Sequence, residues 1–455
     1  MLEGLARFVD RRRWRVYYLA VGATLLFGVA LPKAFSAWDG IEDRFGTVAG
    51  GDFLAFYTGG RMVLEGQSRE LYDLDAQKEL QDELRGRVSN GSTAFVNPPP
   101  YALAMVAFGA LPYVGAVLAW WVVALLILIA ALRAVRSAID RDAFGMGGGL
   151  TFSLLLLPST LALIMGQNTF VSLGLATAAF LALRKEREGL AGIALGAMIL
   201  KPQLAFGFAV VLLMQRRWRA IAVATVVGLA GCALSYVLMP GAWEGYLETL
   251  PRTAALVRNL VPGDEFPAYY QVSVPSALAL LVDGFAPKVG SVLGPLTTLA
   301  IGVGIGRWWR REGWAPGTRR WDLAVAASIA AGWLASPHFL FYDVALFLLP
   351  GWVAYLRLGS DPEGRPFGGG RFYGLTLLTL LIGSLWIPLF SVWLWETLKE
   401  AQLPRAVPQL ITVVLVWWTI ALHRAAGEVD SREKAVGDVG DLTANDPGLR
   451  RSDAE

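Results

Sequence analysis

Residues 113–134 read YVGAVLAWWVVALLILIAALRA, an apolar run with no acidic residue and one basic residue, Arg133, close to its end. A helix needs about 20 such residues to cross the hydrocarbon core of a bilayer. Backbone groups in lipid find no water to bind, so a spanning segment has to satisfy its hydrogen bonds internally. This stretch therefore predicts a transmembrane α-helix.

Similar runs recur along the chain of 455 residues, of which 55% are hydrophobic. Only 17% of the residues are charged, against about a quarter in soluble domains, and the mean hydropathy is +0.49. The sequence therefore predicts an all-α polytopic membrane protein with about twelve transmembrane helices. We place these spans at 15–32, 113–134, 150–165, 168–184, 189–200, 203–215, 219–239, 289–306, 321–335, 338–357, 371–394 and 406–423. Because the spans at 189–200 and 203–215 are short, they are also compatible with a shallow hairpin.

Clusters of Arg and Lys separate the spans with a single parity, which places all of them in the cytoplasm under the positive-inside rule. They lie at 11–15, 133–141, 184–187, 216–219, 307–320 and 357–371. The loops 33–112, 240–288 and 396–405 then face the other side, and 98–111 is expected to form an interfacial helix. Residues 1–423 form the predicted membrane domain, and 424–455 a disordered cytoplasmic tail. The basic N-terminus with its apolar run resembles a signal peptide, which we interpret as an uncleaved anchor with a cytoplasmic N-terminus.

The composition also excludes several classes of function. Cys232 is the single cysteine and the chain has two histidines, so neither an intramolecular disulfide nor a multi-histidine metal centre is expected. A net charge of +3 is too small to indicate nucleic-acid binding. The expected partner is the lipid bilayer, and no cofactor is predicted.

Two charged residues stand where chemistry at a membrane surface would need them. Asp52 begins the first predicted loop among glycines and aromatics, where an ordinary helix cap is the alternative interpretation. Lys201 interrupts an apolar run at a cost of about 2.5–3.5 kcal/mol on insertion scales. It either extends its ammonium group to the interface or holds it in place to bind a lipid phosphate.

Further polar residues fall on the same predicted face. Gln167 and Asn168 follow Gly166 and would either cap the next helix or bind sugar hydroxyls. His338 opens a span five residues before Asp343, a spacing that only suggests a pair.

Taken in order, these motifs resemble glycosyltransferase family 87 over about residues 45–355. The resemblance lies in the order and topology of the pieces, since each piece alone is unspecific. Two positions depart from the family pattern, Asn97 before the prolines and Thr169 after Gln167-Asn168. The pieces are Asp52-Phe53 through Tyr57, Leu71-Tyr72-Asp73, Pro98-Pro99-Pro100, Gly166-Gln167-Asn168, Lys201-Pro202, Arg216-Arg217-Trp218-Arg219, Ser336-Pro337-His338 and Tyr342-Asp343.

The resemblance implies a GT-C-type membrane enzyme of the bacterial cytoplasmic membrane. It implies inverting, metal-independent transfer of a hexose, typically mannose, from a polyprenyl-phosphate sugar to a glycolipid or glycan acceptor on the extracytoplasmic face. Asp52 would be the general base and His338 a second catalytic residue. Lys201 or protonated His338 would supply positive charge to the phosphate. Donor-binding residues would be Lys201, Gln167, Asn168, Tyr57 and Asp343.

Three other functions fit parts of the pattern. A transporter or flippase for a lipid-linked sugar would explain a charged residue within the membrane, but its site is expected near the midplane. An oligosaccharide ligase or polymerase with a pyrophosphate donor shares the general architecture. A purely structural membrane protein is the remaining alternative.

Overall fold

The computed structural model describes residues 41–42, 48–89, 92–140, 146–257, 271–283, 287–310, 314–358 and 412–427. The spans expected at 15–32 and 371–394, the N-terminal anchor and the tail beyond 427 lie outside these residues. The described part consists of helices and turns, and its only β pairing is two isolated bridges. The predicted all-α class is confirmed.

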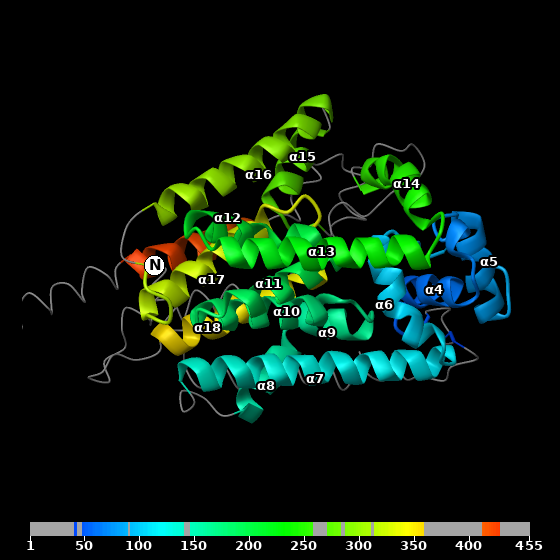
Figure 1. Cartoon of the computed structure of the whole chain (residues 1–455), viewed down its shortest axis with the longest axis horizontal. Coiled ribbons are helices and arrows are strands. Elements are labelled where there is room, and N and C mark those ends of the chain that lie inside the picture. Colours follow the sequence, from blue (N-terminus) through cyan, green and yellow to red (C-terminus); the bar gives the residue numbers. More distant parts are fainter. Residues whose placement is uncertain are drawn as a thin grey trace, which may run out of the picture.

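Helices from the first predicted loop gather at one end of the molecule, the right end of Figure 1. They are α4 (Phe53–Leu64), α5 (Leu74–Arg85) and α6 (Pro99–Gly109). Glycines let α4 and α6 touch backbone to backbone, because a Cβ on Gly60 would lie 2.3 Å from the carbonyl oxygen of Met105. Helix α6 has 11 residues, which confirms a helix too short to cross a bilayer unaided.

A bundle of helices extends from this end. Its longest member, α7 (Tyr113–Ile139), corresponds to the opening sequence and runs along one side of the bundle in Figure 1. A further helix covers 412–427. The other helices are α8 (Met146–Leu155), α9 (Leu157–Ile164), α10 (Thr169–Arg184), α11 (Glu188–Ala197), α12 (Phe206–Met214), α13 (Trp218–Leu238), α16 (Pro287–Trp309), α17 (Arg319–Leu334) and α18 (Leu348–Leu358).

Three helices of the described part are long and apolar enough to cross a membrane, namely α7, α13 and the segment Phe341–Leu358. A fourth is possible if α8 and α9 are one span, although they meet at a bend of 76°. Pro158 in the first turn of α9 marks that bend. Helices occupy most of the other predicted spans, but they are shorter, so a count of twelve crossings is not established.

Basic loops lie together at the end opposite α4 and α6. Arg217, before α13, pairs with Glu188 of α11 at 3.1 Å. A second cluster surrounds the fully buried Asp322 of α17. Asp322 pairs with Arg184, in the last turn of α10, at 3.0 Å and with Arg357, in the last turn of α18. Both clusters join loops for which the sequence predicts the same membrane face.

Two helices fall in the segment 240–288, for which the sequence pattern predicted only a loop. Helix α14 (Ala242–Val257) packs beside the turn that precedes α5, where the rings of Tyr246 and Tyr72 lie 5.4 Å apart. Helix α15 (Val274–Asp283) lies along α16, and α16 also packs against the bundle, where Trp309 donates its indole N–H to the hydroxyl of Ser328 in α17 at 2.8 Å. The two short helices α11 and α12 are separated at Lys201, which agrees both with two short spans and with a shallow hairpin.

Candidate active site

Asp52 lies at the N-terminus of α4, but its side chain makes no capping hydrogen bond. The carboxylate instead accepts a hydrogen bond from the side-chain amide of Gln167, which is distant in sequence. Gly50 and Gly51 precede it with φ values of 75° and 46°, a left-handed turn that favours glycine. The carboxylate is therefore aimed into the molecule and is not used to cap the helix.

The turn at Gly166 meets the Asp52 turn directly. The backbone N–H of Phe53 donates to the carbonyl of Met165 at 3.2 Å. A Cβ on Gly166 would lie 2.5 Å from the Cβ of Phe53, and its φ of 61° is also left-handed. Only glycine allows this approach, and the approach brings Gln167 to Asp52.

Lys201 and Asp343 form a buried ion pair, although 142 positions separate them in sequence. The ammonium nitrogen of Lys201 lies 2.9 Å from Oδ1 and 3.3 Å from Oδ2 of Asp343. It also lies 5.6 Å from the centre of the Tyr342 ring. Lys201 is only 9% exposed, so its charge is neutralised inside the protein and is not extended into water.

His338 lies in the turn before the span Phe341–Leu358, where the hydroxyl of Ser336 accepts from its backbone N–H. Burial and then the charge of Lys201 lower the pKa of the His338 imidazole to about 4, against a smaller opposing effect of Asp343. The imidazole is therefore neutral at pH 7. This favours Lys201, and not a protonated His338, as the cation of the site.

Burial dominates the electrostatics of Asp52 and raises the pKa of its carboxyl group above the ordinary value. The hydrogen bond from Gln167 and then the charge of Lys201 act in the opposite direction. A raised pKa makes the carboxylate a better proton acceptor than a solvated aspartate. Asp52 therefore has the environment of a base within the field of the Lys201 ammonium group.

The remaining candidates take other positions. Asn168 is buried beside the hydroxyl of Tyr101 and makes no side-chain cap for α10, although it precedes that helix. Tyr57 is 2% exposed and donates its hydroxyl to the carbonyl of Leu111 at 2.9 Å. The structure thus brings Asp52, Gln167, Lys201, His338 and Asp343 into one region. It uses Tyr57 to pack α4 against the start of α7.

Two further residues of this region have contacts in the site that the sequence did not predict. Thr169 donates its hydroxyl to Oδ1 of Asp343 at 2.9 Å, although the sequence marked it only as a departure from the family pattern. The ring of Tyr342 lies beside Lys201. Each residue is next to a predicted site residue in the sequence, but its contact arises only because α10 and Lys201 pack against the segment 341–358.

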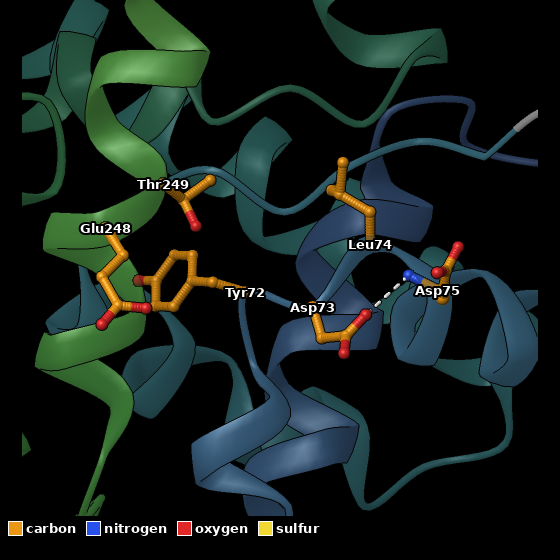
Figure 2. A pocket seen from close by; sticks show the side chains of 6 residues that line it. All are labelled: Tyr72, Asp73, Leu74, Asp75, Glu248 and Thr249. Atoms are coloured by element: carbon orange, nitrogen blue, oxygen red, sulfur yellow. Dashed lines mark hydrogen bonds between the residues drawn. The ribbon is translucent and has the colours of Figure 1, made fainter.

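A separate cavity of about 390 Å³ lies between α5 and α14. Figure 2 shows its lining of Tyr72, Asp73, Leu74, Asp75, Glu248 and Thr249, with the Asp73 carboxylate turned to the backbone N–H of Asp75. Three carboxyl groups repel an anion. This cavity therefore does not suit a lipid phosphate, whereas the Lys201 region does.

No three His, Cys, Asp or Glu side chains of the described residues are grouped as metal ligands would be. The comparisons with known proteins agree with the resemblance seen in the sequence. The model of one family, glycosyltransferase family 87, matches residues 95–337. Neither the curated proteins nor the solved structures contain a significant match.

Proposed function

The chain belongs to glycosyltransferase family 87, and we propose that it transfers a hexose from a polyprenyl-phosphate sugar to a glycolipid or glycan acceptor, with inversion. The observation that carries this proposal is the placement of Asp52. Its carboxylate is released from helix capping, held by Gln167 and exposed to the charge of Lys201. Mannose is the sugar that the family resemblance implies.

The proposed reaction is a single displacement. The acceptor oxygen forms a bond to C1 of the sugar while the bond from C1 to the phosphate oxygen breaks. The bonding electron pair leaves with the phosphate, and the acceptor proton passes to the carboxylate of Asp52. Such general-base help contributes about 10²–10⁴-fold to rates.

The leaving group explains why a cation belongs beside the base. The donor is a phosphodiester with one negative charge, and the departing prenyl phosphate gains a second as the bond breaks. A fixed ammonium group therefore stabilises the transition state more than the bound donor. Lys201 is the proposed source of this charge, and neutral His338 would serve as a hydrogen-bonding partner of donor or acceptor.

We place the reaction on the extracytoplasmic face of the bacterial cytoplasmic membrane, with about twelve spans and both termini in the cytoplasm. The clustering of basic loops at the end opposite Asp52 supports this orientation. The site residues gather at one end of the bundle. This arrangement supports an enzyme over an alternating-access transporter, whose site lies near the midplane.

The decisive experiment is transfer from a synthetic prenyl-phosphate mannose in detergent, with Asp52→Asn and wild type compared. Asn keeps the shape and still accepts from Gln167, but it cannot take a proton at neutral pH. We expect a loss of at least about 10²-fold with unchanged expression and donor-lipid binding. Glu79→Gln, an exposed carboxylate of the same loop region, is the matched control and should retain full activity.

A chelator should leave turnover unchanged, because the proposed mechanism uses no metal. Turnover of Asp52→Asn close to wild type would refute the base assignment, and strong metal dependence would refute the mechanism. Competition between monophosphate and pyrophosphate donors separates this enzyme from an oligosaccharide ligase.

A further inference from the structure

Asp343 has no acceptor position left for a substrate. A carboxylate offers about four lone-pair sites, and four donor contacts fill them. Oδ1 accepts from Thr169 and Lys201, each at 2.9 Å, and Oδ2 accepts from Lys201 and from the backbone N–H of Leu340, each at 3.3 Å. Asp343 is 1% exposed. The Asp343 carboxylate therefore holds Lys201 in place and is not available to bind the sugar donor.

Lys201 can still donate hydrogen bonds to a ligand while Asp343 holds it. An ammonium group carries three N–H donors, and its contacts to Asp343 lie on one side of the nitrogen. Lys201 sits between two short 3₁₀ turns, η3 (Met198–Leu200) and η4 (Pro202–Ala205), with an extended φ of −144°. The long lysine side chain would otherwise move freely, so Asp343 determines where its charge is held.

Thr169 in turn fixes Asp343. It is fully buried at the first position of α10, and it is the one neutral side-chain donor that contacts this carboxylate among the described residues. The other end of α10 is also tied, because Arg184 shares the buried Asp322 with Arg357. Arg357 lies near the end of the same continuous helical segment, Phe341–Leu358, that carries Asp343. Helix α10 and the segment Phe341–Leu358 are therefore linked at both ends, which fixes the position of the Thr169 hydroxyl relative to Asp343.

We propose that Thr169 and Asp343 are positioning residues that together hold the ammonium group of Lys201 where the donor phosphate binds. This inference rests on the proposed function, because it assigns the phosphate to Lys201. It gives Thr169 a role in the reaction and moves Asp343 from binding the donor to orienting the residue that does. Neither residue touches the reacting atoms.

The test measures binding of a prenyl monophosphate and of the uncharged prenol of the same length, together with kcat and KM for the prenyl-phosphate sugar. Thr169→Val removes the hydroxyl and keeps the shape. A hydrogen bond to a charged group is lost, so prenyl phosphate binding should weaken about tenfold. Binding of the prenol should not change, and kcat should fall more than KM rises.

Three variants control the experiment. Thr169→Ser restores the hydroxyl and should recover most of the phosphate binding. Thr177→Val alters another buried threonine of α10, whose hydroxyl makes no hydrogen bond among the described residues, and should behave as wild type. Lys201→Met removes the cation itself, so its loss of prenyl phosphate binding is the largest that Thr169→Val can reach. Should Thr169→Val not fold, Thr169→Ala carries the same test.

Equal loss of phosphate and prenol binding in Thr169→Val would show general damage and overturn the proposal. Unchanged phosphate binding in a folded variant would overturn it as well, as would a wild type that does not prefer the phosphate to the prenol. If the wild type binds prenyl phosphate but transfers no sugar, the proposed function fails. The phosphate series then still decides whether Thr169 positions Lys201.

Discussion

At the scale of single residues, the partners of a side chain decide its role more than its place in the sequence. Asp52 precedes a helix, where an aspartate commonly accepts from backbone N–H groups. Its carboxylate accepts from Gln167 instead, and burial raises its pKa. Activity should therefore fall on the acid side at a pH above the ordinary aspartate pKa of about 3.9.

Removing the hydrogen-bond partner of Asp52 should shift the acid side of the pH profile to still higher pH. The amide of Gln167 donates to the carboxylate and favours its charged form, so it lowers the pKa of Asp52. Gln167→Leu should raise that pKa, and kcat/KM should then rise only at higher pH than in wild type. The measurement is the pH profile of kcat/KM, with the exposed Gln67→Leu as the control. An unshifted pH profile would show that Gln167 does not lower the pKa of Asp52.

At the scale of elements, the site depends on two tight turns that meet. The turn before α4 and the turn before α10 approach so closely that Gly166 has no room for a side chain. Each turn alone resembles an ordinary loop between helices. Their contact brings the amide of Gln167 to the carboxylate of Asp52.

Gly166→Ala should separate these turns. The added Cβ would lie 2.5 Å from the Cβ of Phe53, and alanine at a φ of 61° is strained. Overpacking and backbone strain each cost about 1–3 kcal/mol, so thermal stability should decrease and transfer should be lost. Gly115→Ala, with open space around the glycine of α7, is the control and should match wild type. A stable and fully active Gly166→Ala would contradict this account of the turns.

The helices themselves were largely predictable, because hydrophobic runs in lipid have one main solution. The opening run became α7, and Lys201 marked the separation of α11 from α12. The bend between α8 and α9 was missed, since the apolar run at 150–165 continues through Pro158 without a change in polarity. The pairing of Lys201 with Asp343 was missed because it joins positions 142 residues apart, and hydrophobic periodicity carries no information on such pairs.

At the scale of the whole molecule, the candidate site and the ion pairs between the predicted cytoplasmic loops lie at different ends. The Asp52 region lies at one end, and the pairs that involve Arg184 and Arg217 lie at the other. The orientation that we propose from the positive-inside rule has Asp52 on the outer face. The parity of the basic clusters could be read from the sequence, whereas the number of full crossings could not, because several helices are short.

Cysteine labelling of intact cells tests the orientation. In a background with Cys232→Ala, single cysteines replace Val88, which is 82% exposed near α5, and Ala315, which is exposed before α17. A membrane-impermeant thiol reagent should label position 88 and should reach position 315 only after the cells are opened. Labelling of position 315 but not of position 88 in intact cells would contradict the proposed orientation, because it would place the proposed site on the cytoplasmic face.

The cluster of Arg184, Asp322 and Arg357 also has a consequence for synthesis of the chain. Its members leave the ribosome in the order Arg184, Asp322 and Arg357. Asp322 can therefore pair with Arg184 first, and Arg357 then adds a second cation to the same buried carboxylate. A chain that stops after α17, near residue 340, keeps the Arg184–Asp322 pair but lacks both Arg357 and the largely buried segment Phe341–Leu358. Pulse-chase measurements should show faster degradation of this truncated chain than of one that ends after residue 358, because the longer chain buries that segment and completes the cluster.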